Sequence, residues 1–357
     1  MKKIMVVGAS GVLGRMICTK LFNVFNSQME LIITDYKAER GMNLARFLGK
    51  ETEFRYLDVM DKESILKSIK GVDIVLITVK QAHPYIQRCC IENQIACIDV
   101  TPFYDFVSEI KLLHSEAKRN EIASVPMSGF FPGLSGVLAS KAAEGFHEIH
   151  EMNIGLLQST NAKAGLTGIL DMLAIISERV DYIRSGDAVS CSGFTKTKEM
   201  NFKDLPIPKS VRLIKHAEKD YLSQHLGTDN INYWTSWDSQ VFNKLISLMR
   251  YLGVIKMLFK FRNSRFLSKI ARHNPAKGEI ARLTVEVKGI LNSKVSTREL
   301  CISVPSDYQT TALVTARLAE SLLCKNIKGM VLPFEFMDLE EIFSDSKDHF
   351  VLTQSTN

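Results

Sequence analysis

The sequence of 357 residues lacks any uncharged apolar run of about eighteen residues, the length that an apolar helix needs to cross a membrane. It also lacks a secretory signal, because Met1, Lys2 and Lys3 lead directly into an apolar stretch with no small-residue cleavage site. With 46% hydrophobic and 24% charged residues, the chain can bury a full core and has the length of two domains. We therefore expect a cytoplasmic protein that is neither exported nor inserted in a membrane.

The sequence also lacks the cysteine spacing of metal sites and redox motifs. The chain has seven cysteines without CxxC spacing, at positions 18, 89, 90, 97, 191, 301 and 324. On a helix, the adjacent Cys89 and Cys90 would point about 100° apart, and no second pair lies nearby to complete a metal or redox site. We interpret the seven cysteines as reduced thiols, interpret Cys89 and Cys90 as buried small apolar residues, and expect no metal site.

Acidic residues are absent between Asp238 and Glu279, where nine of the chain's cations lie. The net charge of +6 is therefore local, and the rest of the chain is net negative, which argues against a nucleic-acid-binding protein. Residues 244–272 mix these cations with apolar and aromatic residues. The simplest interpretation is a helix with an apolar core face and a solvated basic face. Weak contact with a membrane surface, attraction of acidic substrates and docking of a partner remain alternatives.

The first 130 residues alternate short apolar runs with longer amphipathic stretches, the pattern of βαβ units and a parallel sheet. The expected strands are 4–7, 31–34, 54–57, 74–79, 96–100 and 122–126, and the expected helices include 15–25, 62–70, 85–93 and 106–120. This predicts an α/β fold with an N-terminal Rossmann domain, a doubly wound parallel sheet.

After about residue 150 the pattern changes to longer strands with period-two texture, at 152–157, 188–192, 280–288 and 300–304. We expect a second, α+β domain with a more antiparallel sheet, suited to substrate binding or dimerisation. The proposed boundaries are 1–130 for the nucleotide-binding domain, 131–310 for the second domain, and 311–357 for a C-terminal segment that packs back on the first domain, with a helix at 310–325.

The most informative segment is the GxxGxxG motif that follows the first strand and opens the first helix. Glycines allow a tight turn and close approach of the backbone to a pyrophosphate, which the helix N-terminus attracts. We expect NAD or NADP to contact Gly8, Ser10, Gly11, Val12, Leu13 and Gly14.

Asp35 ends the second strand, where a carboxylate accepts hydrogen bonds from the adenosine ribose and favours NAD. Tyr36, Lys37 and Arg40 follow. The two cations among them, Lys37 and Arg40, would hold a 2′-phosphate if Asp35 turned aside, so NADP stays as the alternative. At the next strand end, Asp58 and Val59 lie at the expected height of the adenine, although Asp58 is nearly as well explained as a helix N-cap.

The fourth strand ends at Thr78, Val79 and Gln81, which we expect beside the cofactor, because the carboxyl ends of parallel strands line the ligand crevice. The histidine of this loop, His83, has the chemistry of a proton carrier, although a loop histidine is more often a surface residue.

After the fifth strand, Asp99, Thr101 and Tyr104 reach the same crevice edge. There Asp99 and Tyr104 join His83 as catalytic candidates. Asp99 would serve as a base or bind an amine, and its alternative role is to cap the next helix.

Residues 128–139, SGFFPGLSGVLA, resemble the G-x-x-PG stretch that follows the nucleotide-binding sheet in the saccharopine dehydrogenase family. Together with GASGVLG and the strand end at Asp99 this covers the first 140 residues, and weaker similarities follow at 283–289, 308–312 and 329–335. The resemblance adds Phe131, Pro132 and Gly133 to the expected cofactor contacts.

This resemblance implies hydride transfer between a nicotinamide and a carbon bonded to nitrogen in an amino-acid-like substrate. Saccharopine-forming members typically have an aspartate before the PG pair, where this chain has Phe131. The difference puts saccharopine itself in doubt and indicates a less polar substrate.

Two alternatives to this function remain open. One is a related reductase of an apolar or lipid-like substrate, and the other is a dinucleotide-binding sensor without turnover. No Tyr-x-x-x-Lys pair follows the fifth strand, which argues against short-chain dehydrogenase chemistry. An exposed second-domain sheet would favour a homodimer.

Overall fold

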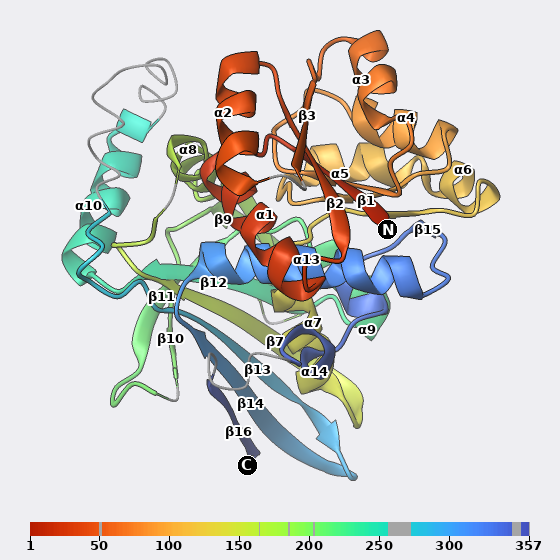
Figure 1. The fold of residues 1–357 in the computed structure, drawn as a ribbon. Coiled ribbons are helices and arrows are strands. Elements are labelled where there is room, and N and C mark those ends of the chain that lie inside the picture. Colours follow the sequence, from red (N-terminus) through yellow and green to blue (C-terminus); the bar gives the residue numbers. More distant parts are fainter. Residues whose placement is uncertain are drawn as a thin grey trace. The chain divides into compact units, whose positions relative to one another are not determined.

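The computed structural model describes residues 1–49, 52–163, 165–184, 186–202, 204–255, 273–344 and 351–356. The chain divides into two compact units, Met1–Val137 with Gln309–Ile342 and Leu138–Tyr308 with Phe343–Asn357 (Figure 1). The long helix α13 (Asp307–Cys324) belongs almost entirely to the first unit, and α7 (Leu134–Ala143) spans the boundary.

The first unit contains a seven-stranded sheet in the order β15-β6-β5-β4-β1-β2-β3, in which every pairing is parallel. Its strands are β1 (Lys2–Val7), β2 (Met29–Asp35), β3 (Thr52–Tyr56), β4 (Ile74–Ile77), β5 (Ala96–Asp99), β6 (Ala123–Val125) and β15 (Gly329–Met330). The order of the first six is that of a dinucleotide-binding Rossmann sheet. β15 adds to this sheet a strand that comes from the end of the chain.

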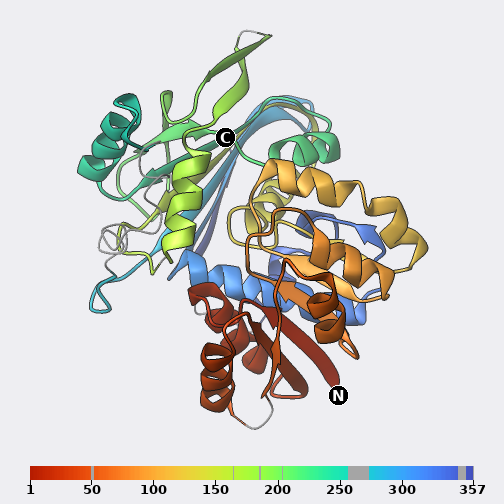
Figure 2. The ribbon, with the colours of Figure 1, turned by 90° about the horizontal axis from the view of Figure 1, so that it is seen from above.

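Helices connect these strands on both sides of the sheet (Figures 1 and 2). They are α1 (Val12–Val24), α2 (Ala38–Leu48), α3 (Lys62–Ile69), α4 (Tyr85–Glu92), α5 (Tyr104–Lys111) and α6 (His114–Arg119), with the short η1 (Pro333–Glu335) and α14 (Leu339–Ile342) near the end of the unit. Because parallel strands need crossover connections, their carboxyl ends and the loops that follow gather at one edge of the sheet. That edge carries the candidate site.

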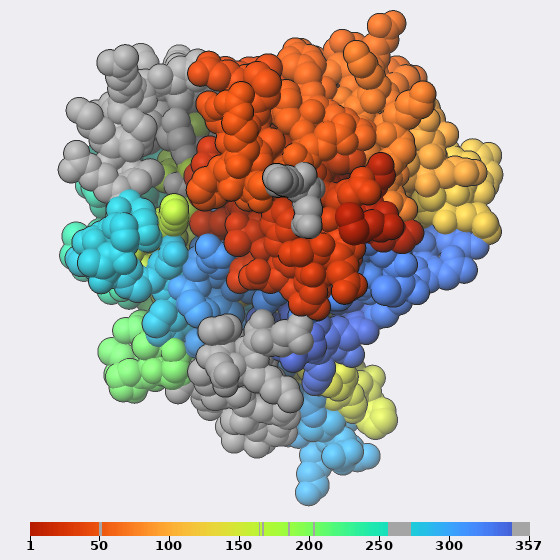
Figure 3. All heavy atoms as spheres, viewed as in Figure 1, coloured from red at the N-terminus to blue at the C-terminus, as the bar shows by residue number. Residues whose placement is uncertain are grey.

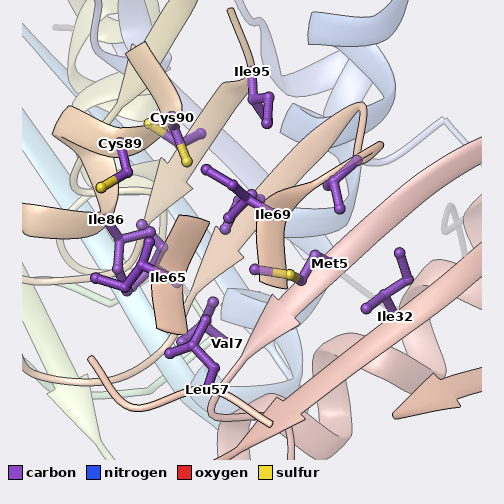
Figure 4. Packing of buried hydrophobic residues seen from close by; sticks show 14 residues of the cluster. Met5, Val7, Ile32, Leu57, Ile65, Ile69, Ile86, Cys89, Cys90 and Ile95 are labelled. Carbon is purple, nitrogen blue, oxygen red and sulfur yellow. The ribbon is translucent and has the colours of Figure 1, made fainter. Parts of the chain in front are cut away.

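One face of this sheet packs against α3 and α4 (Figure 4). Met5 and Val7 of β1 contact a fully buried group that includes Ile69, Cys89 and Cys90. Burial raises the pKa of Cys89, and a hydrogen bond with Cys97 together with burial raises the pKa of Cys90, which keeps both thiols protonated and unreactive. The interpretation of this cysteine pair as small apolar core residues is confirmed.

The second unit contains a seven-stranded sheet in the order β10-β11-β12-β7-β13-β14-β16 and a separate hairpin of β8 and β9. Its strands are β7 (Phe146–Gln158), β8 (Arg179–Arg184), β9 (Asp187–Ser192), β10 (Thr197–Met200), β11 (Lys209–Ile214), β12 (Ile231–Trp237), β13 (Ala281–Leu291), β14 (Lys294–Val304) and β16 (Val351–Thr356), and its helices are α8 (Leu166–Ile175), α9 (Lys219–Leu226) and α10 (Gln240–Tyr251). The central β7 pairs in parallel with β12 and antiparallel with β13, so the sheet is mixed.

The predicted fold class is therefore confirmed, and two local expectations need correction. β7 begins at Phe146, earlier than the predicted start at 152. The helix expected over 106–120 is two helices, α5 and α6, separated at Leu112 and Leu113. The break leaves Leu112 exposed and lets Leu113 pack in a small core with Ile91 and Ile122, which a single continuous pattern did not predict.

The basic stretch 244–272 falls only in part within the described residues. Its beginning belongs to α10, while 256–272 lie outside them. Within the part of the chain that the structure describes, no helix combines the length and apolar character that membrane crossing requires.

The core of the first unit leads to a stability prediction. Ile69→Ala should lower the free energy of unfolding by about 2–5 kcal/mol, because it removes buried methyl groups and leaves a cavity. Leu112→Ala, at a side chain that is 83% exposed, should change it by no more than about 0.5 kcal/mol. Denaturant unfolding of both variants measures the difference, and equal losses would contradict this packing.

Candidate functional site

The turn between β1 and α1 depends on two glycines. Gly8 has φ +79°, and the N–H of Gly11 donates to its carbonyl oxygen at 3.0 Å. A Cβ on Gly8 would overlap Val79, and one on Gly14 would overlap the Gly8 carbonyl and lie 2.8 Å from the Cα of Ala9. The strand, the turn and the helix can therefore pack this closely only with glycine at both positions.

The N-terminus of α1 is free of competing acidic groups. Gly11 is the N-cap and makes no side-chain capping bond, and the first turn of the helix contains no acidic residue. The first N–H groups of a helix have no acceptor within the helix, and the helix dipole makes this end positive. The turn therefore suits a bound pyrophosphate.

Asp35, at the end of β2, is held by its own neighbours. Its side chain is 1% exposed and accepts hydrogen bonds from the Lys37 N–H and from Arg40 Nε and Nη2, each at 2.8 Å. Burial alone would raise the pKa of this carboxyl, but the bonds from Arg40 and Lys37 outweigh it and lower the pKa below its usual value. Asp35 is thus an ionised carboxylate with both oxygens already engaged.

A cavity of about 280 Å³ lies beside this pair, lined by Arg15, Lys37, Glu39, Arg40 and Asn43. Three of these five residues are cations. Tyr36 is 59% exposed and lies against two of them, with Lys37 Nζ 5.5 Å and Arg40 Cζ 5.6 Å from the ring centroid. The α1 and α2 region of the first unit appears in red and orange in Figure 3. A cavity with this lining is suited to a phosphate group.

Three further predicted cofactor contacts follow the strands β3 and β4. Asp58 accepts from the Met60 N–H at 2.9 Å, and the side-chain cap of α3 is Asp61 instead. Val59, next to Asp58, packs partly buried against the core of Figure 4. The hydroxyl of Thr78 donates to the Val7 carbonyl at 2.8 Å and thereby ties the end of β4 to the end of β1.

Asp99, at the end of β5, is the centre of a buried hydrogen-bond network. Its Oδ2 accepts from Gln87 Nε2 at 2.7 Å and from Gln81 Nε2 at 3.5 Å, and its Oδ1 accepts from the Thr101 N–H at 2.7 Å. All of these donors are uncharged. Burial raises the pKa of Asp99 to about 6, and the bonds from Thr101 and the two glutamines only partly offset it.

The other two catalytic candidates occupy different surroundings. The ring of His83 is 57% exposed, and its Nδ1 lies 2.9 Å from Oε2 of Glu109 on α5. Tyr104 is the first residue of α5, and its carbonyl accepts from the Ser108 hydroxyl at 2.9 Å. The structure therefore brings Asp99 together with Gln81 and Thr101, whereas His83 bonds to Glu109.

The loop after β6 carries the expected PG pair and is anchored on both sides. The N–H and the hydroxyl of Ser128 donate to the Asp99 carbonyl at 3.1 and 3.0 Å. From α13, Thr315 donates to the Ser128 carbonyl at 2.9 Å, while Thr311 accepts from the Phe130 N–H at 3.0 Å. This places residues 128–133 beside the carboxyl end of β5.

Inside this loop, Gly133 has φ +118°, and a Cβ there would overlap the Gly129 carbonyl. Pro132 is buried and accepts from the Gly129 N–H at 3.0 Å, while Phe131 is partly buried. Glycine is therefore required at this end of the loop.

Residues 4–125 match the family model of the saccharopine dehydrogenase NADP binding domain. These residues make up most of the first unit, which therefore resembles the nucleotide-binding domain of that family. Among solved structures, the chain is similar to apo saccharopine dehydrogenase (L-Glu forming) from Saccharomyces cerevisiae, with a TM-score of 0.74, 11% identity and 100% of each chain covered. The resemblance predicted from the motifs is confirmed for residues 4–125, and the similarity to this solved structure shows a shared fold.

Two other solved structures are less similar. C. glutamicum DAP dehydrogenase in complex with DAP has a TM-score of 0.48 at 12% identity, and an engineered D-amino acid dehydrogenase bound to NADP+ has 0.47 at 14%, with 97% of this chain and 99% of each of those covered. These scores are too low to establish a shared fold. No curated protein sequence matches the chain significantly.

Sequence reasoning missed four residues that the structure places at or near this edge. Arg15 and Asn43 line the cation-rich cavity, and Gln87 makes the shortest side-chain bond to Asp99. Lys80 lies with its Nζ 3.9 Å from the ring centroid of Phe103, so it links the loops after β4 and β5. Helical spacing of three residues from Arg40 would have pointed to Asn43, but the other three depend on tertiary contacts.

No group of three or more His, Cys, Asp or Glu side chains is placed to hold a metal ion within the described ranges.

Asp99 leads to a prediction about pH. Its pKa is about 6 when folded and near the ordinary 3.8 when unfolded, so the folded state binds the proton more tightly. The contribution of Asp99 to the free energy of unfolding should fall by about 3 kcal/mol as the pH rises from about 4 to about 6. In Asp99→Asn this component of the pH dependence should disappear.

Denaturant unfolding across this pH range measures the effect, with the exposed Asp229→Asn as the matched control. The informative quantity is the slope of the free energy of unfolding against pH. The absolute stability is less informative, because the amide also alters the hydrogen bonds to Gln81 and Gln87. An unchanged slope in Asp99→Asn would show that this carboxyl titrates normally.

Proposed function

We propose that this protein is an NADP(H)-dependent oxidoreductase that transfers hydride at a carbon bonded to nitrogen in an amino-acid-like substrate. The observation that carries the proposal is the cation-lined cavity next to a glycine turn at the carboxyl edge of a Rossmann sheet. The fold shared with a saccharopine dehydrogenase supports the reaction class.

The residues fit a dinucleotide with a 2′-phosphate. Gly8 and Gly14 let the strand, the turn and the helix pack more closely than a Cβ would allow, and the uncapped N-terminus of α1 suits the pyrophosphate. On sequence alone Asp35 favours NAD, but Arg40 and the Lys37 N–H already occupy its carboxylate oxygens. With Asp35 engaged, Arg15, Lys37 and Arg40 would bind the phosphate of NADP.

When bound, the nicotinamide supplies the hydride chemistry, and the protein supplies binding, orientation and proton transfer. We assign proton transfer to His83, because the Glu109 carboxylate at its Nδ1 orients the ring and leaves Nε2 for the substrate. We assign the substrate carboxylate to Lys80, an exposed cation that Phe103 holds at the same edge of the sheet.

Asp99 has a different role in this proposal. It is 2% exposed, and its oxygens accept from Gln81, Gln87 and Thr101, so it cannot touch a substrate without breaking those bonds. We therefore assign it to positioning the loops after β4 and β5. Tyr104, at the start of α5, is placed to contact the substrate from the second of these loops.

Phe131 narrows the substrate class. An aromatic ring at the position before the PG pair removes a charged group that would pair with a cationic substrate, so the amino-acid-like substrate should have an apolar side chain. A reductase of a larger apolar or lipid-like substrate is the second candidate, and Phe131 is the observation that favours it.

The test is titration of NADPH and NADH, followed by a screen for NADPH oxidation with 2-oxo acids paired with amino acids. We expect saturable NADPH binding and turnover with apolar amino acids. In His83→Gln, kcat should fall by about 10²-fold while NADPH affinity stays constant. The exposed His147→Gln is the control.

Each part of the proposal has its own contradicting outcome. Turnover that is unaffected in His83→Gln would remove this histidine from proton transfer. NADPH binding without turnover on amino acids would favour the apolar-substrate candidate, and no binding of either cofactor would overturn the proposed function.

Cofactor choice gives a separate prediction. Arg40→Ala should weaken NADPH binding by about tenfold or more, because it removes a charged hydrogen bond to the phosphate. It should also tighten NADH binding, since it frees the Asp35 carboxylate for the ribose. Lys20→Ala, on the same unit outside the cavity, is the control. Equal losses for both cofactors would contradict the assignment of this cavity to the 2′-phosphate.

A further inference from the structure

Helix α10, in the second unit, has an apolar face exposed to solvent. The side chains of Val241, Leu245, Leu248 and Leu252 are 78%, 50%, 53% and 63% exposed, and Tyr251 is 84% exposed. The four aliphatic residues follow one another at intervals of four, three and four, which places them on one side of a helix. Elsewhere in the described chain, exposed large apolar residues such as Phe47 are common singly, and single ones need no explanation.

The opposite face of α10 anchors the helix. Asn243 is fully buried and bonds twice to the backbone of Trp237, at 2.9 and 2.8 Å, while Ile246 is buried beside it. Ser239 caps the N-terminus by accepting from the Phe242 N–H. α10 is therefore anchored by the packing and hydrogen bonds of its inward face. The exposed leucines on its other face are not needed to hold it in place.

The charge of α10 itself is positive. α10 has no acidic residue and an exposed Lys244, and the sequence contains no acid from residue 239 to residue 278. A second copy of this chain docked face to face would bring two α10 helices without acidic residues together, so no opposite charge would pair across the contact. An anionic lipid surface matches both the apolar stripe and the positive charge.

We propose that the exposed face of α10 docks the protein on membranes that contain anionic lipid. The leucines enter the boundary between headgroups and acyl chains, and the surrounding cations stay with the headgroups. The contact is peripheral and does not depend on the proposed enzymatic function.

The test is sedimentation of the full-length protein with phosphatidylcholine vesicles, with and without phosphatidylserine. We expect pelleting only with phosphatidylserine, and less of it at high salt, because salt screens the attraction to the lipid. The double variant Leu245→Glu, Leu248→Glu should partition at least about tenfold less, through lost apolar burial and added negative charge. Leu112→Glu, at an exposed leucine of the first unit, should bind like the unchanged protein.

Circular dichroism of each variant checks that the fold is retained, and Leu245→Ser, Leu248→Ser repeats the test without adding charge. Absence of pelleting with phosphatidylserine, or equal pelleting of the double variant, would overturn the proposal. So would a dimer in sedimentation equilibrium that the same double variant dissociates, since a second copy would then occupy this face.

Discussion

A buried carboxylate that accepts only from uncharged donors holds the carboxyl edge of the first sheet together. Side-chain oxygens of Asp99 bind the loop after β4 through Gln81 and the loop after β5 through Thr101, while its carbonyl binds Ser128 in the loop after β6. Removing one partner would leave a buried polar group unsatisfied, which costs more than the bond itself contributes. The three loops therefore behave as one unit, and the groups they present to a ligand are positioned together.

The Asp35–Arg40 pair shows how the same sequence position can serve two ligands. A free carboxylate at the end of β2 accepts from a ribose, whereas a paired one leaves its neighbouring cations to bind a phosphate. Arg40 is half exposed and donates to both Asp35 oxygens. The ion pair is therefore bidentate, but its arginine is open to solvent. Cofactor preference therefore rests on a local balance of charge at the edge of an otherwise conventional Rossmann sheet.

The sequence predicted the first unit well, because parallel strands buried on both faces are nearly continuous apolar runs. The run predicted at 74–79 forms β4, Ile74–Ile77, in the centre of the sheet. The break between α5 and α6 was not predicted, because the burial of Leu113 depends on Ile91 and Ile122 from other segments. In the second unit, period two indicated strands but not the parallel pairing of β12 with β7, which joins residues far apart in the chain.

By itself, the sequence determined the Rossmann class, the glycine turn, the acid at the end of β2 and the family, since each depends on residues close together in the chain. Tertiary structure decided that Asp99 is enclosed by two glutamines and that His83 lies against Glu109. The physical reason is that a side chain's charge and hydrogen bonding depend on its burial and partners. Those are set only when distant segments pack together.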